Sequence, residues 1–486
     1  MCRKRRRTSR IRLHPLYIKY IKVMEAYDVI IIGAGLSGLA AGIRLSQYGK
    51  HVLIVERQHY AGGMNSYYRR GDRCYDVGLH AMTNLADPSN HSAPLNTLLR
   101  QLKVRRDELK LCPQQHSCVK FPDATLRFDN DFGTLRSSVR EISPRSADGF
   151  DRLCQAIRDD DAFNPSLGYL SARQVVASYI DDSRLCDMLL CPVMFYGSSW
   201  LDDMDFHQFC VVFRSIFFEG LSRPADGMAP FIDVFTRRLR ENGGELRLGK
   251  SVKTIHMENG LVKSVTLDDG EEIVAKNVVS CAGYPETMAL LSSPTDKPPA
   301  RGELAYTETL FELDVPAAEL GMTESIAFTN SSERFSYCPP TEGSTDLRSS
   351  VLCVPGNFSG VHETEGVAVV RMSHLASYDY WKHLDKNDYR DEKERVMDRQ
   401  QAILEQTSAG FNAHVTRREM FTPLTVERYT GRVGGSIYGS PEKRKDCRTA
   451  VPNLFVCGSD QGYLGIVGSL LSGVVVANRY LLRQDH

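Results

Sequence analysis

The chain has 486 residues, which is enough for two or three domains with a large core. Its 60 basic residues balance its 60 acidic ones, so the overall charge gives no sign of nucleic-acid binding. The 42% of apolar residues and 25% of charged residues are ordinary for a globular protein, and no run of about eighteen apolar residues predicts a membrane-spanning helix.

The cysteines are scattered along the chain. There are thirteen, an odd number, and no two form a Cys-x-x-Cys pair. This pattern argues against a disulfide framework and against a zinc site, so we expect no bound metal. A reducing cytosol is the simplest setting for such a chain, and we expect a cytoplasmic protein.

The first 23 residues are strongly basic. They contain nine Lys or Arg and no acidic residue, and no apolar run of signal-peptide length follows Arg12. One interpretation is a basic tail that contacts anionic lipid. The other, which we favour, is a non-native extension upstream of a true start at Met24, because Met24–Tyr27 is a usual short lead into a strand.

A glycine-rich motif follows the first apolar run. Ile30-Ile31-Ile32 predicts a buried strand, and the next six residues predict a tight turn and the start of a helix. Gly33 permits the turn, Gly35 lets a pyrophosphate approach the backbone, and Gly38 allows the helix to pack closely on the sheet. The free N–H groups and the dipole of the helix N-terminus favour phosphates. The motif therefore predicts a dinucleotide site.

The next strand, residues 51–55, leads to an acidic residue, Glu56. A carboxylate here can accept hydrogen bonds from both ribose hydroxyls and would repel a 2′-phosphate, which argues against NADP. Arg57 and then Gly62-Gly63-Met64 follow. A second glycine pair after the ribose acid resembles FAD enzymes of the amine-oxidase and phytoene-desaturase superfamily, where it lets the chain pass the pyrophosphate and flavin. Met64 stands where that superfamily usually has arginine.

Later segments are expected to return to the cofactor sheet. Residues 251–255, a hairpin of residues 261–267 and 271–275, and a buried strand over residues 277–283 form the first return. A short strand over residues 453–458 and a buried helix over residues 469–482 form the second. Between the returns, residues 387–406 predict a charged surface helix.

These elements predict an α/β fold with two interleaved parts. The first is a Rossmann-type FAD-binding domain built from three segments, and the second is an α+β substrate domain built from the two insertions. We expect the FAD-binding domain to comprise residues 24–110, 226–289 and 421–486, and the substrate domain to comprise residues 111–225 and 290–420.

Four stretches together resemble the FAD-dependent phytoene desaturase, carotenoid isomerase and all-trans-retinol saturase family. The stretches are Asp28–Gly38 with Glu56-Arg57 and Gly62-Gly63; Tyr75–His80; Thr422–Thr425 through Gly434–Gly439; and Gly458–Gly473. The resemblance spans most of residues 24–486, and Gly465-Ile466-Val467-Gly468 is most similar to the retinol saturase and carotenoid isomerase branch. Ser459 separates Gly458 from Asp460, whereas carotenoid desaturases more often have Gly-Asp directly.

The resemblance implies FAD as the cofactor. It implies that the backbone of Val252 contacts the adenine, that Asp460 bonds the ribityl or pyrophosphate region, and that the C-terminal helix points its N-terminus at the flavin. The full set of expected FAD-binding residues is Gly33, Ala34, Gly35, Leu36, Ser37, Gly38, Glu56, Arg57, Gly62, Gly63, Met64, Val252, Gly458, Asp460, Gly465, Ile466, Val467 and Gly468.

The resemblance also implies a long apolar substrate, a carotenoid-like or retinoid-like polyene or isoprenoid that undergoes desaturation, saturation or cis–trans isomerisation. An apolar tunnel would have to recognise it, and Tyr196, Phe213, Phe217 and Tyr438 are candidates to line that tunnel. Ordinary core packing is the alternative for these residues, and an exposed part of the aromatic patch would indicate peripheral membrane contact.

Few polar residues are candidates for a direct chemical role. His80 is the candidate to accept or deliver a proton, with a structural histidine as the alternative. A second nucleotide motif is absent from the sequence, so electrons are expected to pass to or from a quinone, oxygen or a small carrier. Two other functions stay open: an amine-oxidase-like or protoporphyrinogen-oxidase-like flavoenzyme, and a non-catalytic flavin-binding partner in lipid biosynthesis.

Overall fold

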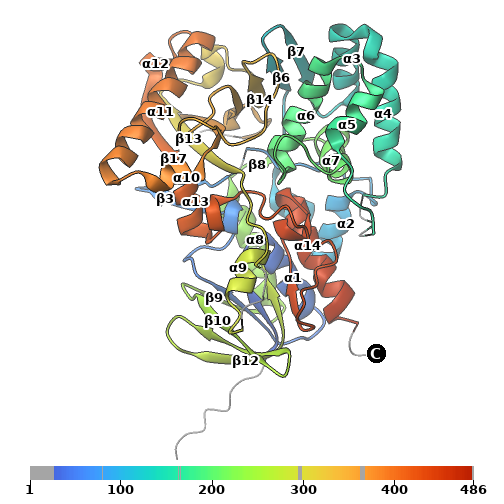
Figure 1. Cartoon of the computed structure of the whole chain (residues 1–486), viewed down its shortest axis with the longest axis vertical. Helices are drawn as coiled ribbons and strands as arrows, with labels where there is room; N and C mark the ends of the chain where they lie inside the picture. The colour runs from blue at the N-terminus through green and yellow to red at the C-terminus, as the bar shows by residue number, and fades with distance from the viewer. Residues whose placement is uncertain are drawn as a thin grey trace, which may run out of the picture.

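The computed structural model describes residues 27–483 except 79, 163, 165, 294–297 and 362–366, so the basic segment 1–23 lies outside the described residues. Figure 1 shows two bodies stacked along the long axis, each built around its own sheet. None of the helices described here is both long and apolar enough to cross a bilayer.

The lower sheet draws its strands from distant parts of the chain. Its order is β10-β11-β12-β1-β2-β9, and β18 pairs with β12 off this path. The strands β1, β2, β9, β12 and β18 run parallel, whereas β10 and β11 add an antiparallel extension. The bounds are β1 (Tyr27–Ile32), β2 (Val52–Glu56), β9 (Glu245–Leu248), β10 (Val252–Glu258), β11 (Leu261–Leu267), β12 (Glu272–Ser280) and β18 (Leu454–Val456).

One strand of this sheet differs from its prediction. The sequence predicts a hairpin arm at residues 271–275 and a separate strand from residue 277, but β12 is continuous across both. Its first half pairs antiparallel with β11, and its second half pairs parallel with β1. The polar residue Lys276 does not interrupt it, because its ammonium reaches the surface and binds Asp28 at 2.8 Å.

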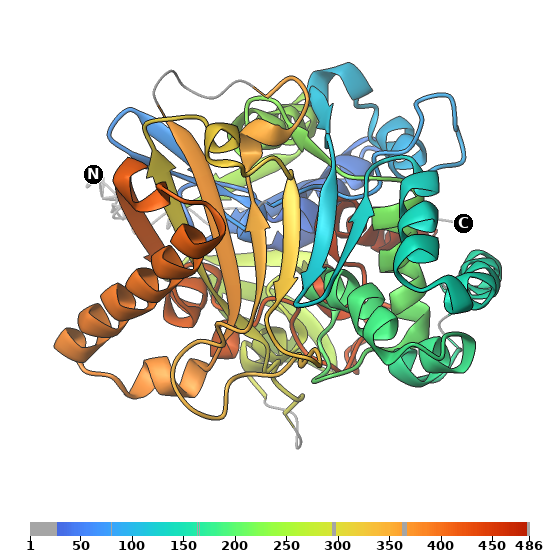
Figure 2. The same ribbon diagram turned by 90° about the horizontal axis from the view of Figure 1, so that it is seen from above.

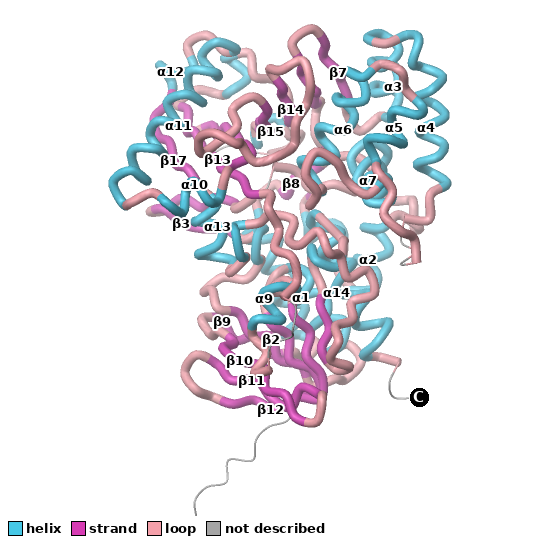
Figure 3. Tube along the Cα trace, viewed as in Figure 1, coloured by secondary structure: helices cyan, strands magenta, loops and turns pink. Residues whose placement is uncertain are grey.

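Helices cover the lower sheet, which Figure 3 shows as the strands gathered at the bottom of the molecule. The helices of this body are α1 (Leu36–Ser46), α2 (Pro94–Leu102), α8 (Met228–Glu241), α9 (Tyr284–Ala289) and α14 (Gly465–Val476). The backbones of α1 and α14 touch, since a Cβ added at Gly473 would lie 2.0 Å from the carbonyl oxygen of Ser37. The helix α14 begins at Gly465, earlier than predicted, and a π-helical turn, η9 (Ala477–Leu481), follows it.

The upper sheet has the order β17-β13-β16-β15-β14-β6-β7. Its strands β14 and β6 are parallel, and its other neighbouring pairs are antiparallel. The bounds are β6 (Ser117–Phe121), β7 (Ala124–Phe128), β13 (Ala305–Leu313), β14 (Ile326–Asn330), β15 (Ser349–Cys353), β16 (Ala368–Ala376) and β17 (Val415–Phe421); short pairs are formed by β3 (Tyr67–Arg70) with β4 (Arg73–Asp76) and by β5 (Leu111–Pro113) with β8 (Ser222–Pro224).

The view from above, Figure 2, shows α11 on one side of the upper sheet and a helical layer on the other. The helical layer comprises α3 (Phe132–Ile142), α4 (Ala147–Asp159), α5 (Ala172–Tyr179), α6 (Ser183–Gly197) and α7 (Phe206–Phe213); the opposite side has α10 (Tyr378–His383), α11 (Lys386–Thr407), α12 (Phe411–His414) and α13 (Pro423–Thr430). The predicted charged helix at residues 387–406 is confirmed as α11, which the side chain of Asp385 caps.

A buried histidine in β16 makes the stability of this sheet dependent on pH. The Nδ1–H of His374 donates to the carbonyls of Ser349 at 2.9 Å and Asp346 at 3.1 Å. Burial lowers the pKa of His374 from 6.5 to about 4. The unfolded chain therefore binds a proton more readily, and stability is lost as the pH falls from about 6.5 towards 4, by roughly 1.4 kcal/mol per pH unit.

Urea unfolding between pH 4 and pH 8 measures this dependence. We expect His374→Gln, which keeps an N–H donor without the titration, to flatten the acid side of the stability profile. His116→Gln at an exposed position is the matched control and should leave the profile unchanged. Identical profiles for wild type and His374→Gln would contradict the assignment.

Candidate active site

Two glycine loops meet at the carboxyl ends of β1 and β2. The amide of Gly62 donates to the carbonyl of Ala34 at 2.9 Å, and Gly35 pairs with Gly62 in an isolated bridge. Glu56, the last residue of β2, accepts the amide of Ala34 at 2.8 Å and the amide of Gln58 at 2.8 Å through its two carboxylate oxygens. Each oxygen keeps a second lone pair, so the carboxylate can still accept ribose hydroxyls.

Open space lies beside Gly35, where the sequence predicts a pyrophosphate. Gly35 has a φ of −64°, which any residue can adopt, and an added Cβ would meet nothing within 4 Å. Neither its backbone conformation nor packing within the chain therefore requires glycine here. By contrast, Gly33 has a φ of +101°, and a Cβ at Gly38 would lie 2.1 Å from the carbonyl oxygen of Gly33. The open space borders the start of α1, whose N-cap has no side-chain partner, and such a helix start favours phosphate.

The predicted cofactor residues after Glu56 lie in two places. Gly62, Gly63 and Met64 belong to the second glycine loop, whereas the side chain of Arg57 contacts the upper body. Gly62 and Gly63 both have positive φ, at +114° and +60°, and Gly63 begins the short turn η1 (Gly63–Asn65) that contains the half-buried Met64. Arg57 points elsewhere, because its guanidinium donates to the carbonyl of Arg428 at 2.6 Å and so caps the end of α13.

The other predicted cofactor residues lie along the same edge of the lower body or at its antiparallel extension. Val252 begins β10 and pairs with Leu267 of β11. Gly458 follows β18 and lies against the start of α1, since an added Cβ would be 3.3 Å from Ser37 Oγ. Gly465 opens α14 next to Thr83, and the following residues Ile466, Val467 and Gly468 form the first turn of that helix.

The carboxylate of Asp460, a predicted cofactor ligand, is bound by amides and a guanidinium of the protein itself. It is fully buried, and its carboxylate accepts the amides of Tyr284 at 2.5 Å and Ser440 at 2.9 Å and lies 3.3 Å from the guanidinium of Arg432. Burial acts to raise the pKa of Asp460, but the charges of Arg432 and Lys443 and the two amides hold it below its ordinary value. Asp460 thus joins three loops beside the cofactor edge.

A small apolar cavity of about 50 Å³ lies beside the start of α14. Gly465 and Leu464 line it together with Thr83 and Tyr196, which was predicted to contact substrate. The other lining residues are Asn84, Pro94, Gln208, Val211, Val212, Ser215, Tyr463, Val467, Gly468 and Leu471. None of these described lining residues is charged, so the cavity suits an apolar group.

The other predicted substrate residues lie away from this cavity. Phe213 and Phe217 are buried in the aromatic core of the upper body, with ring centroids 4.7 Å apart, and Phe217 also contacts Phe128 at 5.0 Å. The hydroxyl of Tyr438 donates to the carbonyl of Phe195 near the end of α6.

His80 belongs to a buried polar network with residues of β13 and β16 in the upper sheet. Its Nε2 lies 2.9 Å from Ser373 Oγ and 3.3 Å from a carboxylate oxygen of Glu308, whereas its buried Nδ1 has no partner among the described residues. Arg371 binds the other oxygen of Glu308 and donates to the carbonyl of Asp76 at 2.9 Å. No local pattern in the sequence predicts this network, because its members lie far apart in the chain.

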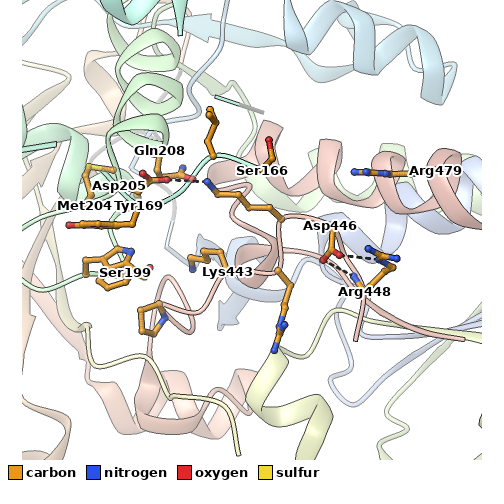
Figure 4. Close-up of a pocket in the computed structure, with 16 residues that line it drawn as sticks. Ser166, Tyr169, Ser199, Met204, Asp205, Gln208, Lys443, Asp446, Arg448 and Arg479 are labelled. Carbon is orange, nitrogen blue, oxygen red and sulfur yellow. Dashed lines mark hydrogen bonds and ion pairs between the residues drawn. The ribbon is translucent and has the colours of Figure 1, made fainter. Parts of the chain in front are cut away.

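A larger cavity of about 540 Å³ opens between the helical layer and the C-terminal loops (Figure 4). Figure 4 shows Tyr169 and Ser199 on one side of it, with Lys443 beside Ser199, and Arg448 and Arg479 on the other side. Trp200 and Gln208 also line the cavity. Sequence reasoning did not identify Gln208, Lys443 or Arg479, which come together only in the folded chain.

Comparisons with known proteins agree with this geometry. The family model for flavin-containing amine oxidoreductases matches residues 36–481. The chain is 22% identical over 496 residues to a prolycopene isomerase of Daucus carota, covering 93% of this chain and 80% of the relative, and 24% identical over 286 residues to a lycopene-forming phytoene desaturase of Pantoea ananas, covering 54% and 57%. The fold matches an oxidoreductase from Methanosarcina mazei with a TM-score of 0.62 and 16% identity, covering 93% and 100%.

These findings confirm the predicted α/β fold with a Rossmann-type FAD-binding domain and the prediction of FAD as the cofactor. The chain belongs to the family of flavin-containing amine oxidoreductases and is an FAD-dependent oxidoreductase.

Proposed function

We propose that this oxidoreductase acts on a long isoprenoid or polyene, carotenoid-like or retinoid-like, by desaturation, saturation or cis–trans isomerisation. The observation that carries the proposal is the uncharged, mostly apolar lining of the cavity beside Gly465, whose volume of about 50 Å³ takes an apolar group of the substrate and not the whole chain. A cationic amine would find no carboxylate among the described residues of that lining. Similarity to a prolycopene isomerase over 93% of this chain supports the same substrate class.

In this proposal, different segments of the chain bind the cofactor and the substrate. Residues 24–110, 226–289 and 421–486 hold FAD, and residues 111–225 and 290–420 shape the substrate site. The open space at Gly35, the carboxylate of Glu56 and the start of α14 at Gly465 support these cofactor contacts. When bound, FAD supplies the hydride-transfer or electron-transfer chemistry, and the chain positions the substrate and excludes water.

We further propose that His80 holds or moves a proton and that Glu308 orients its ring. The carboxylate lies 3.3 Å from Nε2, and the buried Nδ1 remains without a described partner. We expect His80→Ala to lower kcat at least about 100-fold while the flavin content stays at the wild-type level. The pH profile of kcat with Glu308→Gln as the comparison variant measures the orienting role. Unchanged kcat in His80→Ala would show that the histidine is structural.

Exposed apolar residues support a lipid substrate and peripheral membrane contact. Tyr169, Leu170, Trp200 and Leu201 are all exposed, and Tyr169 and Trp200 line the larger cavity. Aromatic residues of this kind are favoured where an apolar surface meets water. We expect wild type to float with phosphatidylcholine vesicles and a Trp200→Ser, Leu201→Ser variant to float less. If all of the wild-type protein stayed in the fractions that contain no vesicles, peripheral membrane contact would be contradicted.

Anaerobic incubation of the purified holoenzyme tests the substrate class. We expect a polyene among phytoene, lycopene isomers and retinol to bleach the flavin or to be isomerised, and simple amines to do neither. Product chromatography then distinguishes desaturation, saturation and isomerisation, and added quinone, oxygen or a small carrier identifies the electron partner. Bleaching by an amine alone would favour the amine-oxidase-like function, and a flavin that no compound changes would favour a non-catalytic partner.

A further inference from the structure

The larger cavity combines an apolar wall with a cationic wall. Tyr169 and Trp200 form the apolar side, with ring centroids 4.8 Å apart, and Met204 lies beside them. Basic residues of the loop of residues 441–448 and Arg479 also line the cavity, and Figure 4 shows Arg448 and Arg479 on the side opposite Tyr169. Such a combination suits a ligand that has both an apolar part and an anionic part.

The charges of this lining do not balance. The basic residues are Lys443, Arg444, Lys445, Arg448 and Arg479, and the acidic residues are Asp205 and Asp446. Both acids are already paired, since Lys445 lies 3.2 Å from Asp205 and Arg448 lies 3.0 Å from Asp446. Three basic residues therefore remain without a carboxylate partner among the described contacts.

The contacts of these three residues are with neutral groups. Lys443 Nζ donates to the carbonyl of Tyr438 at 2.6 Å. Arg444 donates to the hydroxyl of Tyr284 at 2.5 Å, and its buried Nε has no described partner. Arg479 stacks over a tyrosine ring at 5.5 Å. Burial lowers the pKa of Lys443 to about 8 although Asp460 acts to raise it, so an anion beside this ammonium would stabilise its charged form.

The larger cavity adjoins the small apolar cavity beside α14. Gln208 lines both cavities, and its buried Nε2 has no described partner. Gly197 lines the larger cavity and Leu464 the smaller, and a Cβ added at Gly197 would lie 3.3 Å from Leu464 Cδ1. The two cavities therefore lie next to each other, with Gln208 shared between them.

We propose that the larger cavity binds the anionic end, a carboxylate or a phosphate, of an elongated apolar substrate whose chain extends past Gln208 towards Gly465. This inference rests on the proposed function and narrows it from a polyene hydrocarbon to an amphipathic polyene. Lys443 and Arg479 supply the positive charge that attracts the anion, and Tyr169 and Trp200 cover the adjoining part of the chain.

Fluorescence of Trp200 tests the proposal, because the chain has only two tryptophans and the other, Trp381, is fully buried and does not line this cavity. The holoenzyme is titrated with retinoic acid and geranylgeranyl diphosphate as anions, and with retinol and geranylgeraniol as their neutral counterparts. We expect each anion to bind at least tenfold more tightly than its neutral counterpart. The relative affinities of the two anions, with inorganic phosphate as a competitor, distinguish a carboxylate from a phosphate ligand.

Two variants and a control complete the test. Lys443→Met and Arg479→Gln should each reduce the preference for the anion to less than threefold, whereas Lys263→Gln, which alters an exposed ion pair with Glu258 on the lower sheet, should leave it unchanged. Equal affinity for anions and neutral compounds, or displacement of retinoic acid by micromolar NADPH, would overturn the proposal.

Palmitate separates this inference from the proposed function. If palmitate binds with the same dependence on Lys443 and no polyene is turned over, the anion site stands and the polyene substrate fails. If neutral polyenes are turned over and Lys443→Met has no effect on any ligand, the proposed function stands and the anion site fails.

Discussion

Replacing Gly35 with alanine should weaken the binding of FAD without unfolding the protein. The added Cβ has no neighbour within 4 Å in the chain, and the φ of −64° suits alanine. The methyl group would instead occupy the space that a pyrophosphate needs in order to reach the backbone at the start of α1. We expect FAD affinity to fall more than tenfold, which corresponds to more than about 1.4 kcal/mol. The flavin-to-protein absorbance ratio and the Tm of the apoprotein measure the two effects separately.

Gly473→Ala is the matched control for this experiment. Its Cβ would lie 2.0 Å from the carbonyl oxygen of Ser37 and 2.7 Å from the amide nitrogen of Ala41, so α14 and α1 would have to separate. Overpacking of this kind costs about 1–3 kcal/mol, and we expect the apoprotein Tm to fall. If Gly35→Ala lowered the apoprotein Tm as much as Gly473→Ala does, Gly35 would serve the fold rather than the cofactor.

Replacing Arg371 with methionine should destabilise the protein by about 3–5 kcal/mol. The guanidinium of Arg371 is buried in the upper body, where it binds Glu308 of the neighbouring strand β13 and the carbonyl of Asp76. Its removal leaves a buried carboxylate whose main countercharge is gone, although His80 remains 3.3 Å away. Equilibrium unfolding in urea at pH 7 measures the loss.

A double variant and a pH series test the cause. Arg371→Met combined with Glu308→Gln should be more stable than Arg371→Met alone, because no buried charge remains unpaired. Burial acts to raise the pKa of Glu308, but the charges of Arg371 and His80 hold it well below its ordinary value. The Arg371–Glu308 pair therefore stabilises the fold at pH values above the pKa that Glu308 has in the unfolded chain, and this stability is lost as the pH falls through the pKa of Glu308 in the folded protein. The difference in free energy of unfolding between wild type and Arg371→Met should accordingly become smaller in acid. If the effects of the two substitutions on the free energy of unfolding were strictly additive at every pH, the pairing of Arg371 with Glu308 would be contradicted.

Local patterns predicted the parts of the fold that are held by neighbours in sequence. The turn from Gly33 to Gly38, the strand ending at Glu56 and the charged helix α11 each depend on residues close together in the chain. The start of α14 was misplaced because Gly465, with a φ of +71°, looks like a loop residue in the sequence although it begins a helix.

The sequence could not predict contacts between distant segments. The pairing of Arg371 with Glu308 depends on the register of β16 against β13 in the upper sheet, and the pairing of Arg432 with Asp460 depends on how the C-terminal loops meet. The cationic cavity has the same origin, since Tyr169 and Lys443 come from separate segments. Which charged residues are buried becomes clear only in the folded chain. The polar network around His80 therefore could not be predicted from the sequence.

The pairing of β18 with β12 has a consequence for synthesis of the protein on the ribosome. Residues 454–456 are translated long after β1 and β2, yet they lie beside β12 in the same sheet. Until they emerge, the edge of β12 at Val278 and Val279 is open to pairing with other chains. We therefore expect nascent chains stopped before residue 454 to aggregate or to bind chaperones, and the FAD-binding body to form only near the end of translation.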